Sequence, residues 1–110
     1  MRAARLRRGE DIARVRADGI ARNDKLFSLR ALTTDLAAVR VAVASSRAVG
    51  GAVERNRARR RIREALRVAL DRRRAGPGAD LLVIARPAAL SAPATELRQA
   101  VERELDTVLA

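Results

Sequence analysis

An apolar stripe at helical spacing runs through the most basic part of this chain, between residues 52 and 73. Its members recur at i, i+4, i+7, i+8 and i+11, and they are Ala58, Ile62, Ala65, Leu66 and Ala69. At about 100° per residue these positions share one side of an α-helix, and an apolar side of this kind has to pack on a core. The pattern therefore predicts a long helix that starts after Gly50-Gly51, where glycine permits a tight turn, and ends near Arg73.

The other sides of this helix are dominated by positive charge. Residues 55–63 include six arginines. A polar ridge lies roughly 140° around the helix from the apolar stripe; it consists of Asn56, Arg60, Arg63 and Arg67, with Arg57 and Arg61 beside it. A solvated helical face normally mixes charges of both signs, but only Glu54 and Glu64 offset these arginines. The sequence therefore favours contact with a polyanion over a face that is merely solvated.

Composition limits the partners and the chemistry that this chain can have. Its 24 basic residues against 13 acidic ones give a net charge of +11 over 110 residues, which favours nucleic acid as the polyanion, with a membrane surface as the competing choice. The length fits a single domain, and we expect one over residues 1–110, with residues 1–5 flexible. Without Cys or His the chain lacks the commonest metal ligand and general base, so we expect no catalytic residue in it.

No stretch of the sequence indicates membrane insertion or secretion. Apolar runs fall well short of the ~18 residues that a membrane-spanning helix needs. The first residues lack the apolar core of a secretory signal. We therefore expect a cytoplasmic protein with no membrane partner.

The remaining elements follow from local patterns. Residues 10–19 predict a short helix with acidic residues in its first turn, and residues 21–25 a polar connector. Residues 26–32 and the alternating residues 38–44 predict two strands that pair antiparallel across the turn at 33–35. The apolar run 80–86 predicts a central strand that forms a βαβ unit with the preceding strand and the long helix. A last helix begins at Pro93 and carries Leu97, Val101, Leu105 and Leu109 at helical spacing.

Phe27 is the only aromatic residue of the chain. It shares a strand face with Leu29 under the two-residue period of a strand, which favours packing in the core. The alternative is a surface on which a nucleic-acid base stacks. A single aromatic residue leaves both interpretations open.

The segment 46–64, with Arg55-Asn56-Arg57 at its centre, resembles the signature of the bacterial ribonuclease P protein subunit. That signature is Ser-Lys-Lys, a hydrophobic residue with Gly-Asn-Ala-Val, Arg-Asn-Arg, Lys-Arg and Arg-Glu. Leu6-Arg7-Arg8, the predicted strands and the last helix follow in the family's order, so the resemblance covers roughly residues 5–109.

This resemblance implies a fold and a function. The fold would be α+β: a single RNA-binding domain, an α/β sandwich of order αβββαβα with a left-handed βαβ crossover, like the second domain of a small-subunit ribosomal protein. The function would be to bind the catalytic RNA of ribonuclease P and the 5′ leader of precursor tRNA, and so to assist endonucleolytic removal of the leader. In this family the RNA carries the catalysis with Mg²⁺, and no organic cofactor or small-molecule substrate takes part.

The resemblance also assigns roles to residues. Contacts with the catalytic RNA would come from Arg47, Arg55, Asn56, Arg57, Arg59, Arg60 and Arg63. The polar ridge read from the helical period adds Arg61 and Arg67 to this RNA-binding set. The cleft for the leader would be lined by Ile12, Phe27 and Arg30. The chain departs from the family pattern at Ala48 and Gly51, which offer fewer side-chain contacts, and at Ile12 and Arg30, where aromatic residues are common. Either the Arg30 guanidinium or Phe27 would then provide the stacking surface.

Three other functions compete with this interpretation. A ribosomal or general RNA-binding protein without a role in tRNA processing has the same charge and size, and only Arg55-Asn56-Arg57 argues against it. A DNA-binding protein would place the long helix in a major groove, but no second helix at helix-turn-helix spacing is predicted. A metal-dependent nuclease would need clustered carboxylates, and the acidic residues here are scattered along the chain.

Overall fold

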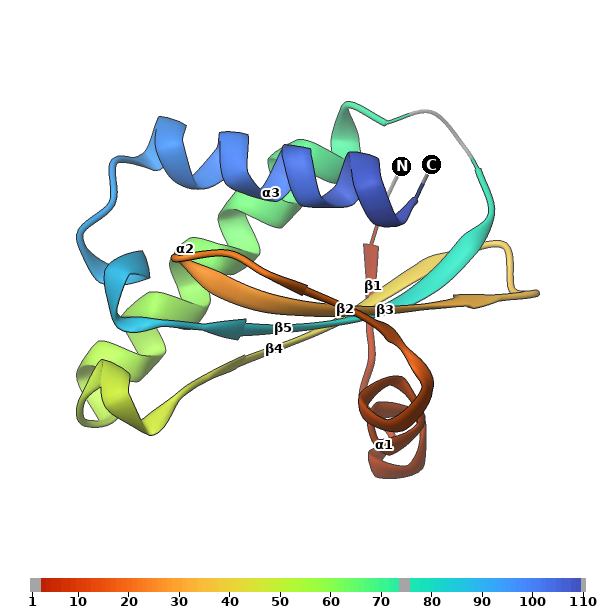
Figure 1. Cartoon of the computed structure of the whole chain (residues 1–110), viewed down its shortest axis with the longest axis horizontal. Helices are drawn as coiled ribbons and strands as arrows, with labels where there is room; N and C mark the ends of the chain where they lie inside the picture. The colour runs from red at the N-terminus through yellow and green to blue at the C-terminus, as the bar shows by residue number, and fades with distance from the viewer. Residues whose placement is uncertain (1–2, 74–75, 110) are drawn as a thin grey trace.

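The computed structural model describes residues 3–73 and 76–109 as one five-stranded sheet with helices on both faces (Figure 1). The strands are β1 (Ala3–Arg5), β2 (Ile20–Asn23), β3 (Phe27–Thr34), β4 (Val39–Ser45) and β5 (Gly78–Ala85), in the sheet order β1-β4-β5-β3-β2. The helices are α1 (Gly9–Asp18), α2 (Ala52–Asp71) and α3 (Ala94–Val108), with short 3-10 turns η1 (Arg47–Val49) and η2 (Pro87–Leu90). Helices α2 and α3 cover one face and α1 the other (Figure 1). The α/β sandwich is confirmed.

The predicted antiparallel pair of residues 26–32 and 38–44 is wrong. Strand β5 lies between β3 and β4, antiparallel to β3 and parallel to β4. Strand β5 is buried along almost its whole length and therefore takes the centre of the sheet, where neighbours cover both faces. Residues 35–38 are enough to cross the two strand spacings, about 10 Å, that this insertion creates.

Two strands were not predicted from the residues. Residues 3–5, expected to be flexible, form β1 and pair parallel with β4; residues 1–2 lie outside the described part of the chain. Most of the expected polar connector 21–25 belongs to β2, which pairs antiparallel with β3. Both strands lie at sheet edges and every residue in them is exposed, so neither carries the apolar alternation that identifies a strand.

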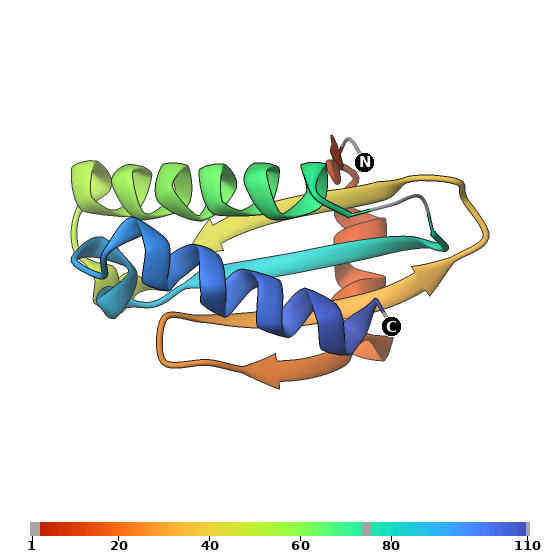
Figure 2. The same cartoon turned by 90° about the horizontal axis from the view of Figure 1, so that it is seen from above.

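The βαβ unit is confirmed, and its crossover has the uncommon hand. Strands β4 and β5 are parallel neighbours joined through α2. Seen from the helical side, both strands run to the left, α2 lies above them, and β5 lies below β4 in the view (Figure 2). This path is left-handed, as the family resemblance implied and against the usual right-handed rule.

The main core lies between the sheet and the two long helices. Every member of the predicted apolar stripe of α2 is buried, and Leu70 extends the stripe. Helix α3 adds Leu97, Val101 and Leu105 to the same core. A smaller cluster of Leu6, Val15 and Leu82 holds α1 against the opposite face of the sheet.

An ion-pair network also holds α1 on the sheet. Arg40 on β4 donates to both carboxylate oxygens of Asp80 on β5, with Nε–Oδ1 at 2.7 Å and Nη2–Oδ2 at 2.6 Å. Its Nη1 lies 3.5 Å from Asp11 Oδ2 on α1. The hydrogen bond from Arg40 to Asp80 raises the pKa of Arg40. Asp80 is only 3% exposed, and a buried carboxylate that loses its ion-pair partner strongly destabilises a fold.

Candidate nucleic-acid interface

Helix α2 presents a row of exposed side chains on the side away from its buried stripe. Asn56, Arg57, Arg60 and Arg63 are exposed. None of the four side chains makes a hydrogen bond or ion pair with another residue of the described ranges. We call these four residues the α2 ridge. Three unpaired guanidinium groups on one helix are a strong local source of positive potential, and each can bind a phosphate bidentately.

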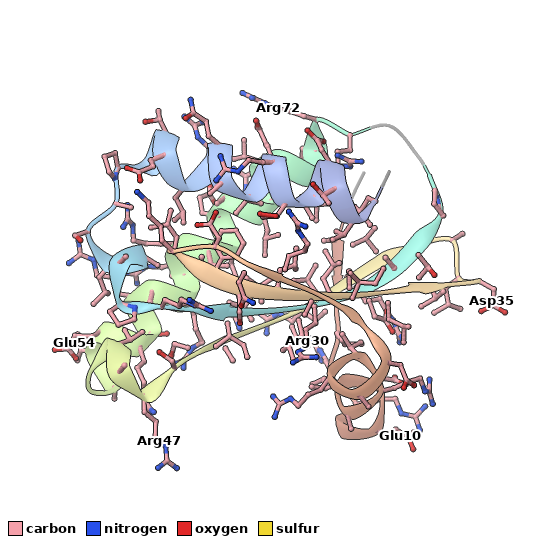
Figure 3. The ribbon with its side chains drawn as sticks, viewed as in Figure 1. Glu10, Arg30, Asp35, Arg47, Glu54 and Arg72 are labelled. Carbon is pink, nitrogen blue, oxygen red and sulfur yellow. The ribbon has the colours of Figure 1, made fainter. Side chains whose placement is uncertain are left out.

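The loop before α2 is built so that the helix starts directly after the sheet. Val49 in η1 is buried and anchors the loop. Gly50 has a φ of 136°, and a Cβ there would lie 3.2 Å from the Cβ of Glu54. Only glycine fits this position without strain. Arg47 in the same loop is exposed and points away from the sheet on its α1 side (Figure 3).

Arg55 and Arg59 do not belong to the exposed ridge. Both lie within about 60° of the apolar stripe by helical phase, and both are half-buried. Arg59 Nη1 lies 3.5 Å from Ser45 Oγ at the end of β4. The Nε of Arg55 and the Oγ of Ser46 are buried, with no hydrogen-bond partner among the described residues. A buried polar atom without a partner costs about 1–3 kcal/mol, so an external hydrogen-bonding group would stabilise this end of the helix.

Arg61 has a structural contact within the protein, and its predicted role in RNA binding stays a prediction. Its guanidinium donates to the carbonyl oxygens of Ala89, at 2.5 Å, and Ala92. These carbonyls belong to η2 and the turn that leads into α3. The helical period explains the contact, because Arg61 is three residues after Ala58 and four before Ala65 and so borders the buried stripe on the α3 side.

Arg67 is exposed but has partners on its own helix. It lies 2.6 Å from Glu64 Oε1 and 3.3 Å from Asp71 Oδ2. The hydrogen bond between Arg67 and Glu64 lowers the pKa of Glu64 and raises the pKa of Arg67. Because two carboxylates offset its charge, Arg67 attracts a phosphate less than the α2 ridge does.

Two of the three predicted cleft residues lie beside α1. Ile12 packs against the small cluster that holds α1 to the sheet. Arg30 lies beneath the sheet next to α1 (Figure 3), and its Nη1 donates to the carbonyl oxygen of Arg16 at 2.9 Å. A cation is favoured there because Arg16 is in the last turn of α1. The roles of Ile12 and Arg30 toward an RNA leader stay predictions.

Phe27 is the third predicted cleft residue, and this prediction is wrong. It is 1% exposed and belongs to the main core under α2 and α3. Strand alternation sends Phe27, Leu29 and Ala31 to the helical face and Ser28 and Arg30 to the α1 face. The same alternation places Ala44 on β4 and Ile84 on β5, both half-buried, on the α1 face. The sequence does not single out these small and aliphatic residues, because they carry neither an aromatic ring nor a charge.

The acidic side chains do not cluster in the described residues. No three His, Cys, Asp or Glu side chains within residues 3–73 and 76–109 lie close enough together to hold a metal ion. Asp11 and Asp80 come near each other but share the Arg40 guanidinium. In the same ranges no helix is long and apolar enough to cross a membrane.

Comparison with known proteins gives this surface its context. The sequence model of the family described as Ribonuclease P matches residues 1–108. The chain belongs to the ribonuclease P protein family. It is 42% identical over 97 residues to the Ribonuclease P protein component of Chloroflexus aurantiacus, covering 88% of this chain and 71% of that protein. Over 104 residues it is 36% identical to the Ribonuclease P protein component of Herpetosiphon aurantiacus, covering 94% and 83%.

Solved structures of this family have the same fold. The ribonuclease P protein from Thermotoga maritima matches with a TM-score of 0.81 at 21% identity, covering 96% of this chain and 98% of that one. The protein from Staphylococcus aureus matches with a TM-score of 0.78 at 23% identity, covering 99% and 100%. Nothing in these comparisons favours a ribosomal or general RNA-binding protein. The interpretation based on Arg55-Asn56-Arg57 is therefore supported.

Proposed function

We propose that this chain is the protein subunit of a ribonuclease P ribonucleoprotein, in which it binds the catalytic RNA and the 5′ leader of precursor tRNA. The observation that carries the proposal is the α2 ridge, whose exposed arginines have no partner among the described residues, in a chain of this family. The positive charges of such a row repel one another, which destabilises the protein unless an anion neutralises them. A phosphate backbone supplies anions at regular spacing, and contact with it releases condensed counterions.

We assign the α2 ridge and Arg47 to the catalytic RNA. Contacts to phosphates position an RNA without reading its sequence, which suits a subunit that holds a structured RNA. Arg55 and Arg59 support this surface from the buried side. Both side chains are half-buried, and Arg59 also contacts Ser45 at the end of β4, but their charge is close enough to strengthen the local potential.

We assign the 5′ leader to the face of the sheet beside α1, where Ile12 and Arg30 lie. The half-buried Ser28, Ala44 and Ile84 extend this face across the sheet. No aromatic side chain lies there, because Phe27 is buried on the other face. The leader would therefore be held by aliphatic contacts, by its phosphates and by the Arg30 guanidinium, on which a base can stack.

The chemistry belongs to the RNA partner in this proposal. The chain has no His or Cys, and its described carboxylates form no metal-binding group. The Mg²⁺ ions that such cleavage uses would be held mainly by RNA phosphates. The protein would contribute by binding, by orienting the leader and by lowering the repulsion between two RNAs.

Reconstitution tests this proposal. Cleavage of a precursor tRNA is measured with the catalytic RNA of the same organism at low Mg²⁺, with and without this protein, and with the protein alone. We expect strong stimulation by the protein and no cleavage by the protein alone. An absence of stimulation at matched ionic strength would contradict the proposal and leave a general RNA-binding protein. Cleavage by the protein alone would contradict the assignment of the chemistry to RNA.

A further inference from the structure

A groove separates the C-terminal half of α2 from the sheet edge that β1 and β4 form. Val41 and Val43 on β4 line it together with Leu66 on α2. Ala3 and Arg5 line it from β1, and Arg63 lines it from α2. Figure 2 shows the N-terminal segment beside the end of α2, over this edge of the sheet.

The sequence of β1 explains why the groove stays open. Ala3 and Arg5 are in register with Val39 and Val41, and residues paired across strands project to the same face. Their side chains therefore lie on the α2 side of the sheet. Val39 is fully buried, but Val41 is paired with the exposed Arg5, and Val43 lies beyond the last residue of β1. Val41 and Val43 consequently remain half-exposed although they pack against the main core.

The unpaired charges at the groove are positive. Arg5 and Arg63 are exposed, and within the described ranges neither side chain has a hydrogen bond or ion-pair partner. The one acidic residue that lines the groove, Asp71, lies 3.3 Å from Arg67. A ligand that fits this surface combines an anionic group with a flat group that can cover aliphatic side chains.

We propose that this groove binds one unstacked nucleotide of the RNA partner, with its base on Val41 and Val43 and its phosphate between Arg5 and Arg63. The proposal rests on the proposed function and adds a site to it. Arg63 also belongs to the α2 ridge, so RNA that follows the ridge reaches the groove without a break. A base inside a duplex cannot enter a groove of this kind, so the nucleotide comes from a loop, bulge or junction.

The test separates filling the groove from removing charge. Ala3→Trp fills the groove and keeps the net charge, whereas Arg5→Gln removes one charge and leaves the groove open. Arg103→Gln is the matched control, because Arg103 lies on the outer face of α3 and pairs with Asp24. Affinity for the catalytic RNA is measured at two salt concentrations, and the nucleotides that each variant protects from chemical modification are mapped. Circular dichroism checks the fold, which should stay intact because Ala3 and Arg5 are both exposed.

We expect Ala3→Trp to weaken binding about tenfold with an unchanged salt dependence, because it displaces a base and no phosphate contact. We expect Arg5→Gln to weaken binding and to lower the log-log salt slope by about one. Both variants should lose protection at the same unpaired nucleotide, and Arg103→Gln should retain it.

Wild-type affinity and protection in Ala3→Trp would overturn the groove assignment. Loss of protection within a duplex would do so as well. Arg60→Gln is measured alongside: if it weakens binding while Ala3→Trp does not, the groove proposal fails and the proposed function stands. If neither variant changes the affinity, both fail. If an acidic peptide bound in the groove in place of RNA, a nucleotide would also be rejected as the occupant.

Discussion

Removing two charges from the α2 ridge should change how RNA binding depends on salt. Arg57 and Arg60 are exposed and have no partner within the described part of the chain, so neither side chain has a hydrogen bond or ion pair to lose. Each phosphate contact contributes about 0.9 to the slope of log affinity against log salt on a duplex, so Arg57→Gln with Arg60→Gln should reduce the slope by about 1.8. Across a fourfold change in salt, the ratio of wild-type to variant affinity should then change about twelvefold.

The assay is a titration of the catalytic RNA between 50 and 200 mM salt, values chosen to give roughly that fourfold range. A second variant, Arg103→Gln with Arg72→Gln, removes the same charge from residues that pair with Asp24 and Glu102. It should leave the slope almost unchanged. An unchanged slope in the ridge variant would refute the reasoning, because the ridge would then contact no phosphate. An equal change in both variants would also refute it, because binding would then depend on total charge alone.

Three further substitutions test side chains that make contacts inside the protein. Arg61→Ala should lower the free energy of unfolding by about 1–3 kcal/mol in a denaturant titration while the RNA salt slope stays at the wild-type value; a lower slope would restore Arg61 to the interface. Phe27→Ala should cost about 3–5 kcal/mol of stability, whereas Phe27→Leu should cost little and leave leader cleavage unchanged; a selective loss of cleavage in Phe27→Leu would mean that the ring contacts RNA. Arg40→Ala should destabilise the fold by about 3 kcal/mol or more because it leaves Asp80 buried without a partner, and a loss below about 1 kcal/mol would contradict this.

Structural features that depend on residues close together in the sequence could be predicted. The apolar stripe of α2 is one, since its spacing alone identifies the buried side, and all five predicted members are buried. The same helical period, applied to each arginine, also separates Arg61 and Arg55 from the exposed ridge. A count of basic residues hides that difference, because a long side chain beside a buried stripe is held by the protein itself.

Structural features that depend on residues far apart in the sequence could not be predicted from local patterns. The position of β5 between β3 and β4 is set by which strand needs cover on both faces, and no local signal in residues 26–44 reports it. Strands β1 and β2 gain their structure from pairing with β4 and β3 at the edges, where no apolar residue is needed. The left-handed crossover was expected only from the family resemblance, because general rules of chain geometry favour the right-handed one.

The central claim is that the N-terminal half of α2 lies against RNA, and a directed cleavage probe tests it most directly. The chain has no cysteine, so Val53→Cys, on the ridge side of α2 and 79% exposed, and Thr107→Cys, exposed on α3, each give one attachment point for an iron chelate. Radicals from the Val53 position should cut the catalytic RNA at a few defined sites, and those from Thr107 should not. Equal cutting from both positions, or cutting from Thr107 alone, would contradict the account.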